Sequence, residues 1–314
     1  MRIAVASGKG GTGKTTVAVS VARSLAEEES AFHSGQSRTP GGSSLLFLDC
    51  DVEAPDAHLF LDPVIEERVP ATVQIPVIDP DMCTACGDCA EACQFSALAV
   101  LGGEVLFLPE LCHGCGSCTL ICPEKAITEA PRELGILESG RAGGISFARG
   151  ILNVGEALAV PVIRQLKEWA RPADGQTTIL DAPPGTSCPT VETLSGSDYV
   201  LLVTEPTPFG LHDLALAVDV LRELGVPGGV IINRDGIGDE GVEEYCAAES
   251  LPVLLRIPFE REIAEGIAQG RTLLDVRPVY RERFRALFQM ISGRLIGAGS
   301  HEVETEASPR GGVT

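Results

Sequence analysis

The 314-residue sequence is poor in aromatic residues, poor in positive charge and without long apolar runs. Aromatic residues make up only 4% of it, so the core that its 44% hydrophobic residues can build is expected to be aliphatic. The 24 lysines and arginines stand against 44 aspartates and glutamates, a net charge of −20 that offers no basic face to a nucleic acid. No apolar run reaches the ~18 residues of a transmembrane helix. We therefore expect no nucleic-acid partner and no membrane insertion.

An export signal is also missing, because the chain starts directly on the apolar run of residues 3–6; we expect a cytoplasmic protein. Disulfides need an oxidising compartment. Eight of the eleven cysteines lie between Cys83 and Cys122. These eight are therefore expected to bind metal rather than one another.

A glycine-rich loop stands between that first apolar run and a helix expected over residues 17–25. Residues 8–15 fit the G-x-x-x-x-G-K-[ST] pattern of a phosphate-binding loop. Glycines let the backbone N–H groups point at phosphate oxygens, and the helix N-terminus adds partial positive charge. Lys14 is expected to neutralise the β- and γ-phosphates of ATP, and Thr15 to ligate Mg²⁺. The expected nucleotide-binding residues of the loop are Gly8, Lys9, Gly10, Gly11, Thr12, Gly13, Lys14, Thr15 and Thr16.

A second lysine, Lys9, stands near the start of this loop. With it, the loop resembles the deviant phosphate loop of the MinD/Mrp/ArsA/nitrogenase-iron-protein class of ATPases. The resemblance implies a homodimer with ATP at its interface, in which Lys9 acts on the nucleotide of the partner subunit. A cation at this position would help to stabilise charge on a transferring phosphoryl group.

Two apolar runs end in acidic residues. Residues 45–48 lead into Asp49 and Asp51, and residues 177–180 lead into Asp181. Open α/β sheets bind ligands at the carboxyl ends of their strands. The resemblance gives Asp51 a catalytic or switch role; the alternative is an ordinary acid that caps the next turn. Asp181 is expected to hold Mg²⁺, and Gly185 to offer its N–H to the γ-phosphate, because residues 181–185 look like the D-x-P-P-G motif of Mrp-like members.

Two later segments are expected to bind the base. Asn233 ends the apolar run of residues 229–232, and the resemblance makes it the residue that recognises adenine; a turn-capping asparagine is the alternative. Pro258 ends the next apolar run and starts a segment that resembles the other base-flanking element of the class.

The eight clustered cysteines form two copies of C-x₂-C-x₂-C-x₃-C at an offset of 29 residues. This is the spacing of bacterial two-cluster ferredoxins, in which the fourth cysteine of each run ligates the other cluster. We therefore expect two [4Fe–4S] clusters, although Gln94 stands where the family has proline. Zinc and disulfides are the alternatives, and zinc sites rarely show this doubled run. The expected ligands are Cys83, Cys86, Cys89 and Cys122 for the first cluster, and Cys112, Cys115, Cys118 and Cys93 for the second.

Cys188 stands seven residues after Asp181. By similarity to the nitrogenase iron protein, it is a possible ligand of a cluster shared across a dimer, but no second cysteine with an obvious matching role follows it. A buried or redox-sensitive thiol is the alternative.

Together these features predict a doubly wound, mostly parallel α/β sheet with an inserted small α+β ferredoxin domain. We expect the ATPase domain over residues 1–62 and 150–297, the ferredoxin over 77–131, linkers at 63–76 and 132–149, and a disordered tail at 298–314. The first hypothesis is ATP hydrolysis coupled to electron transfer or to docking on a redox partner. The alternatives are an iron–sulfur carrier or metallocofactor-assembly ATPase, and a MinD-like spatial organiser.

Overall fold

The computed structural model describes residues 1–32 and 43–302. Seven parallel strands form most of a sheet ordered β11-β10-β9-β1-β8-β2-β7-β6-β3. The near-continuous apolar sequence of these strands suits a sheet that is covered on both faces. The parallel strands are β1 (Arg2–Ala6), β2 (Leu45–Asp49), β7 (Ile145–Leu152), β8 (Thr177–Asp181), β9 (Tyr199–Thr204), β10 (Gly228–Asp235) and β11 (Val253–Pro258).

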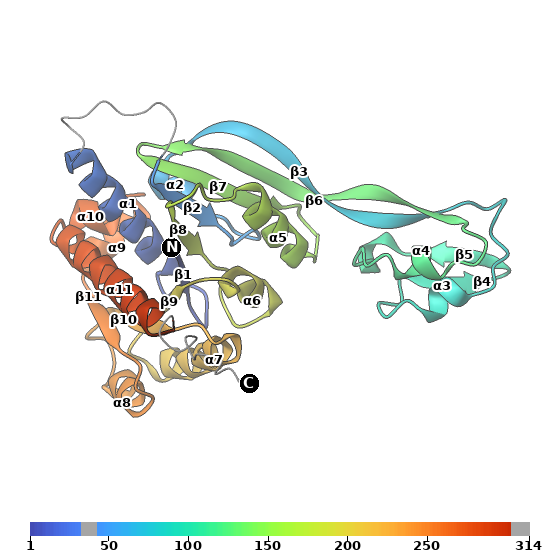
Figure 1. Ribbon diagram of the computed structural model, residues 1–314. Helices are drawn as coiled ribbons and strands as arrows, with labels where there is room; N and C mark the ends of the chain where they lie inside the picture. Colours follow the sequence, from blue (N-terminus) through green and yellow to red (C-terminus); the bar gives the residue numbers. More distant parts are fainter. Residues whose placement is uncertain (33–42, 303–314) are drawn as a thin grey trace, which may run out of the picture.

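Helices cover both faces of the sheet (Figure 1). Alternate residues of one strand enter different cores: Ile3 and Val5 pack on one face, Ala4 and Ala6 on the other. The first face is covered by α1 (Lys14–Phe32), α9 (Arg261–Ala268), α10 (Leu273–Val276) and α11 (Tyr280–Glu302). The second is covered by α5 (Ala159–Trp169), α6 (Cys188–Leu194), α7 (Pro208–Leu224) and α8 (Gly241–Ala248). The short α2 (His58–Leu61) follows β2.

The segments expected to be linkers are strands, so that part of the domain prediction is wrong. β3 (Val64–Ile78) and β6 (Ile127–Ala142) pair antiparallel along their length, and β6 also pairs antiparallel with β7. The prolines of β3 and the glycines of β6 interrupt the alternation of apolar and polar residues that would indicate strands. β3 is the last strand of the sheet, a position that tolerates the missing amide of Pro70 and Pro76.

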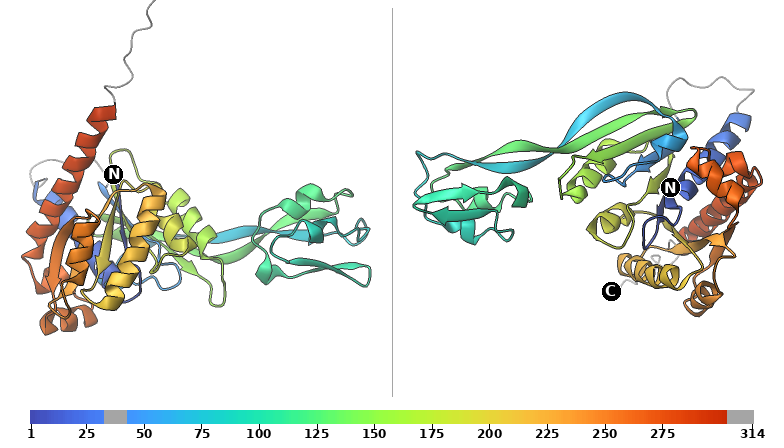
Figure 2. Two further views of the ribbon diagram at one scale, coloured as in Figure 1. Left: turned by 90° about the horizontal axis from the view of Figure 1, so that it is seen from below. Right: turned by 180° about the vertical axis from the view of Figure 1, so that it is seen from behind.

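The β3–β6 pair carries the insert away from the sheet as a two-stranded arm (Figures 1 and 2). Pairing of β6 with β7 stops at Gly135, opposite Leu152 at the carboxyl end of β7. The eight residues 127–134 therefore continue past the carboxyl edge of the parallel strands, which is about 26 Å at strand spacing.

Side chains of the ATPase body hold the root of this arm. The Gln165 side chain of α5 accepts a hydrogen bond from Thr72 N (3.0 Å) and donates one to Thr72 O (2.9 Å). These bonds coincide with a register irregularity between Ala71 and Thr72. An ion pair between Arg132 and Glu156 adds a second attachment. The arm is thus tied to the body at the point where it leaves the sheet.

The insert is a small two-fold repeat held by few apolar contacts. Its elements are α3 (Asp88–Glu91), β4 (Leu98–Leu101), β5 (Glu104–Phe107), the 3₁₀ turn Pro109–Leu111 and α4 (Ser117–Ile121). Left-handed residues recur at the same offset as the cysteines: Gly87 and Gly116 precede the two helices, and Ser96 and Lys125 follow them. The repeated cysteine runs therefore adopt repeated backbone conformations.

The C-terminal helix α11 buries Phe284, Leu287 and Ile291 against α1 and its neighbours. It continues to Glu302, so the expected disordered tail from residue 298 is wrong over its first residues; the remainder lies outside the described residues. Within the described ranges, no helix has both the length and the apolarity needed to cross a bilayer.

Candidate functional site

The glycine-rich loop joins β1 to α1 at the carboxyl edge of the sheet, as expected for a phosphate site. Gly11 and Gly13 adopt φ of +79° and +91°, which other residues rarely reach. A Cβ atom on Gly13 would lie 2.3 Å from the Asn233 side chain, so the loop needs glycine here for space as well as for conformation.

Lys14 lies between two of the predicted acids. Its Nζ is 2.7 Å from Asp181 Oδ1 and 3.7 Å from Asp51 Oδ2, and Thr15 Oγ1 lies 3.4 Å from the same nitrogen. Burial by itself lowers the pKa of Lys14, but the adjacent carboxylates outweigh it and raise the pKa above its ordinary value. The fold therefore brings together four residues that the sequence predicts for the site: Lys14, Thr15, Asp51 and Asp181.

Asp181 has one satisfied and one unsatisfied oxygen. Its side chain is fully buried, and Oδ2 has no hydrogen-bond partner among the described residues. Burial raises the pKa of this carboxyl, and Lys14 opposes the rise. A buried carboxylate oxygen beside a threonine hydroxyl is a donor set that suits Mg²⁺, directly or through water. The two predicted magnesium ligands, Thr15 and Asp181, thus fit the ion.

Asp49 and Asp51 have different surroundings: Asp49 bonds the turn after β2, whereas Asp51 faces Lys14. Asp49 is fully buried and accepts hydrogen bonds from Ala57 N (3.1 Å) and Asp51 N (3.2 Å), which fold the turn after β2. Burial raises the pKa of Asp49 well above its usual value. Asp51 instead faces Lys14 and the cavity, and burial raises its pKa to about 6. The alternative for Asp51 was an acid that caps the turn after the strand. In the structure it is Asp49, not Asp51, whose side chain accepts the hydrogen bonds from that turn.

A cavity of about 440 Å³ opens beside the loop. Lys14, Thr15, Thr16 and Asp51 line one part of it, and apolar residues from β11 and α9 line another, among them Ile257, Pro258, Phe259 and Ile263. A charged end and an apolar end suit a phosphate tail and a flat base. Asn233 also lines the cavity, but its amide donates to Thr12 O at 2.7 Å, and its role in reading the base stays a prediction.

Two predicted phosphate contacts are occupied within the chain. Gly185 N donates to Ser7 O at 2.9 Å rather than pointing into the cavity. Lys9 Nζ lies 3.4 Å from Glu205 Oε2 of its own chain. Its action on a partner subunit stays a prediction, and would require this ion pair to open.

The sequence interpretation overlooked Glu205 and Arg234. Glu205 follows β9 and is almost fully buried, and Arg234 Nη1 lies 2.5 Å from its Oε1. Arg234 Nη2 also donates to Gly11 O at 3.1 Å. These contacts tie the phosphate loop to the strand end that carries Asn233. The signal was available, because Glu205 ends an apolar run in the same way as Asp51 and Asp181 do.

The eight clustered cysteines surround two separate pockets in the insert. We call them pocket A, lined by Cys83, Cys86, Cys89 and Cys122, and pocket B, lined by Cys93, Cys112, Cys115 and Cys118. Each pocket thus takes three cysteines from one run and the last cysteine of the other run. This is the same division that the sequence predicts for two clusters.

The cysteines of each pocket are a donor set that suits an iron–sulfur cluster. Among residues 1–32 and 43–302, no three Cys, His, Asp or Glu side chains are arranged to hold a single metal ion. The last cysteine of each run also accepts an amide hydrogen bond at 3.3 Å, Cys93 from Ala97 and Cys122 from Ala126. Such bonds to sulfur are typical of iron–sulfur ligands.

Cys188 is the first residue of α6 and is exposed. The alternative was a buried or redox-sensitive thiol; burial is thereby contradicted, and a redox-sensitive thiol or a ligand of a shared cluster both stay predictions. Cys50 and Cys246 are buried, and burial raises the pKa of the Cys246 thiol to about 11.

Two family models match separate parts of the chain. Residues 3–32 match a CobQ/CobB/MinD/ParA nucleotide binding domain, and residues 75–123 match a 4Fe-4S dicluster domain. The first match covers the phosphate loop and α1, and the second covers both cysteine pockets. They confirm the predicted combination of a MinD-like phosphate-loop domain with an iron–sulfur ferredoxin domain.

Relatives of similar length come from Methanocaldococcus jannaschii. The uncharacterized protein MJ0578 is 29% identical, with 93% of this chain and 96% of the relative covered. The uncharacterized protein MJ0579 is 26% identical, with 87% and 91% covered. The match to each runs through both the nucleotide-binding part and the insert.

Solved structures of MinD share the fold. The cell division ATPase MinD of Pyrococcus furiosus has a TM-score of 0.53 at 19% identity, covering 93% of this chain and 98% of that one. The septum site-determining protein MinD of Pyrococcus horikoshii, complexed with Mg-ADP, has a TM-score of 0.51 at 18% identity, covering 98% and 97%. The predicted mostly parallel sheet of the MinD type is thereby confirmed.

Proposed function

We propose that this protein, a MinD-like phosphate-loop fold joined to an iron–sulfur ferredoxin domain, hydrolyses ATP and uses the nucleotide state to control electron transfer from two [4Fe–4S] clusters to a redox partner. The supporting observation is the placement of the arm. β6 leaves the sheet at the carboxyl edge, which is also the edge that carries the phosphate loop, Asp51 and Asp181. A partner that covers this edge would meet both the nucleotide site and the flank of the arm.

The residues of the nucleotide site divide the work of hydrolysis. Lys14 and the loop amides would bind the phosphate tail, and Thr15 and Asp181 would hold Mg²⁺, whose charge would help to neutralise the phosphates. Asp51, facing Lys14, would position or deprotonate the attacking water. Its pKa of about 6 leaves it mostly ionised at neutral pH, as a base requires.

A continuous stretch of chain links the nucleotide site to the arm. Asp51 is followed by the turn that Asp49 holds through Ala57, then by α2, and β3 begins at Val64. A shift of Asp51 toward a bound nucleotide would therefore be passed to the first residues of β3, which pair with β6 inside the sheet, and along β3 to the root of the arm at Thr72. This gives the coupling a continuous physical route.

We also propose a homodimer that closes over the nucleotide edge. Large apolar side chains are exposed in segments that follow the carboxyl ends of several parallel strands: Leu59 in α2 after β2, Val154 after β7, Phe209 at the start of α7 after β9, and Phe259 after β11. Apolar residues gathered along one edge are typical of an interface. A second copy seated there would bring its own Lys9 to the partner's nucleotide once the contact with Glu205 opens.

The test is an anaerobic redox titration of the iron–sulfur protein followed by EPR, without nucleotide, with ADP, and with a non-hydrolysable ATP analogue. We expect the analogue to shift at least one potential by ~30 mV, about 0.7 kcal/mol for one electron. The Lys14→Gln variant is the control and should show no shift. If the potentials of the wild-type protein are indifferent to nucleotide while ATP releases iron to an apo-acceptor, the protein is a cluster carrier instead.

A further inference from the structure

The two halves of the insert repeat at an offset of 29 residues, so every residue around pocket A has an equivalent around pocket B. The cysteines and the helix-preceding glycines match, and so do the amide bonds to Cys93 and Cys122. Ala126 and Ala97 also match, but the other equivalent side chains that line the pockets differ. Since the backbones are alike, these side chains are what can make the two pockets behave differently.

Pocket A is lined by two carboxylates, Asp88 from the first residue of α3 and Glu124 from the turn after Cys122. The single lysine of the insert, Lys125, is exposed and does not line the pocket. Negative charge beside a cluster disfavours the addition of an electron, because the reduced cluster carries one more negative charge. The carboxylates around pocket A therefore favour a low reduction potential for a cluster bound there.

Pocket B replaces both of these carboxylates. Ser117 stands in the place of Asp88, and its hydroxyl lies 3.4 Å from Cys115 Sγ. Phe95 stands in the place of Glu124 and stacks on His113, with ring centroids 3.8 Å apart. The one carboxylate lining this pocket, Glu129, accepts a hydrogen bond from the Thr119 hydroxyl at 3.0 Å.

These replacements act in the same direction. The Cys115 thiol donates to the Ser117 hydroxyl at 3.4 Å, but a ligating thiolate can only accept, so the hydroxyl would then donate to it and stabilise the added negative charge. Pocket B also has one lining carboxylate where pocket A has two, which lowers the repulsion. We propose that the two pockets hold their clusters at different reduction potentials, with pocket B the higher. The inference rests on the proposed function only in requiring that both clusters are bound.

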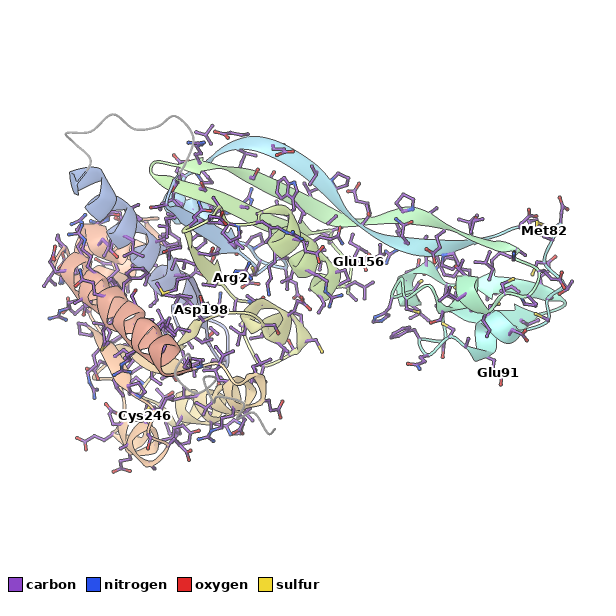
Figure 3. The ribbon with its side chains drawn as sticks, in the orientation of Figure 1. Arg2, Met82, Glu91, Glu156, Asp198 and Cys246 are labelled. Atoms are coloured by element: carbon purple, nitrogen blue, oxygen red, sulfur yellow. The ribbon has the colours of Figure 1, made fainter. Side chains whose placement is uncertain are left out.

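The order of potentials gives the insert a direction. Pocket B lies against Gln74 and Pro76 of β3, whereas pocket A lies against Ile78 and Ile127, further along the arm from its root. Met82, which precedes the first cysteine of pocket A, lies at the end of the insert far from the ATPase body (Figure 3). A low-potential one-electron donor would reduce the cluster in pocket A. That cluster would then pass the electron to the cluster in pocket B, which lies closer to the nucleotide edge, and would itself be reoxidised.

The experiment is an EPR-monitored titration of the whole protein, reduced with dithionite, together with an iron count. We expect two separate one-electron waves whose equilibrium constants differ at least about tenfold, which corresponds to ~59 mV. The Asp88→Asn/Glu124→Gln double variant should raise the lower wave and leave the upper one in place. Ser117→Ala should lower the upper wave alone. Glu91→Gln removes one negative charge on α3 outside both pocket linings, as Asp88→Asn does within pocket A; it is the control and should move neither wave beyond a small common shift.

The outcomes separate this inference from the function on which it rests. An iron count near ~8 per chain with one shared wave, or with both waves moved equally by the double variant, overturns the inference and leaves the two-cluster proposal intact. A reversed assignment, in which Ser117→Ala moves the lower wave, overturns it as well. An iron count near ~4 overturns the two-cluster proposal itself.

Discussion

The nucleotide edge and the cysteine insert place reactive groups by opposite means. At the nucleotide edge, Lys14, Asp51 and Asp181 come from separate strands and loops, and a sheet with two packed faces holds them together. In the insert, the buried core is small, and the eight cysteines come from a short stretch whose turns bring them around two pockets. The first site is therefore dictated by tertiary packing, whereas the second is largely dictated by local spacing.

The largest effect is expected from Lys14→Gln, which acts on the nucleotide edge alone. The variant should lose ATP hydrolysis by about 100-fold or more, the scale of losing one preorganised charge partner. It should also unfold more easily, by about 3 kcal/mol, because Asp181 stays buried without its cation. ATPase rates and urea unfolding measure both effects.

The matched variant for Lys14→Gln is Lys9→Gln. Lys9 is partly exposed and pairs with Glu205, whereas Lys14 pairs with Asp181, so the loss of Lys9 should spare nucleotide binding while slowing hydrolysis. An Lys9→Gln protein that binds ATP and hydrolyses it at the normal rate would contradict action across a dimer. Iron content should be normal in both variants, since the insert has its own ligands.

The next effect separates the two pockets. Cys122→Ser lies in the second cysteine run but lines pocket A, so its EPR spectrum should match that of Cys86→Ser and differ from that of Cys115→Ser. Iron should fall to about half in each variant, with ATP binding unchanged. A Cys122→Ser spectrum that matches Cys115→Ser instead would show that each run closes its own cluster.

Asp51→Asn is expected to change how stability depends on pH. The folded-state pKa of Asp51 is raised to about 6, above the unfolded value of about 3.9, so the folded protein binds its proton more tightly. The free energy of unfolding of the wild type should therefore fall, relative to the variant, as pH rises from about 4 to about 6. Above that window the variant should be more stable by about 2 kcal/mol, after allowance for solvent screening.

Urea unfolding of wild type and variant at pH 4 and pH 7 checks this sign. Glu53→Gln, an exposed acid in the same turn, is the control and should change stability by less than about 0.5 kcal/mol at either pH. If the difference in unfolding free energy between variant and wild type is the same at pH 4 and pH 7, Asp51 titrates at its ordinary pKa in the folded protein.

The smallest effect is expected at the root of the arm. Gln165→Leu removes the paired hydrogen bonds to Thr72 and should cost about 1–2 kcal/mol. Amide hydrogen exchange should quicken near Thr72 while iron content and ATP binding stay unchanged. If nucleotide-induced shifts in cluster potential also shrink, the root carries the coupling; unchanged shifts would place the coupling elsewhere.

Sequence reasoning succeeded where a motif is local and failed where pairing is distant. The phosphate loop joins a strand to a helix as its pattern predicts, and the cysteines of the two runs line two pockets. Asp51 faces Lys14, and its catalytic or switch role stays a prediction.

Residues 63–76 were missed as a strand because their partner is far away in sequence: Val64 pairs with Arg141. Residues 132–149 form a local hairpin, in which Ala142 pairs with Ile145, and the glycines of β6 obscured it. Glu205 ends an apolar run, but its contacts with Lys9 and Arg234 join residues distant in sequence.

The sequence by itself determined the chemistry: a phosphate loop with two lysines, acids at strand ends, and eight thiolates at ferredoxin spacing. These depend on residue type and short separations, which a chain fixes before it folds. Only the tertiary structure decided that the insert stands on a two-stranded arm and that the arm leaves the sheet at the nucleotide edge. It also decided that two carboxylates line one cysteine pocket, while a serine, an aromatic stack and a single carboxylate line the other. These follow from strand pairing and from the packing of the repeats against the arm, which depend on contacts between residues distant in sequence.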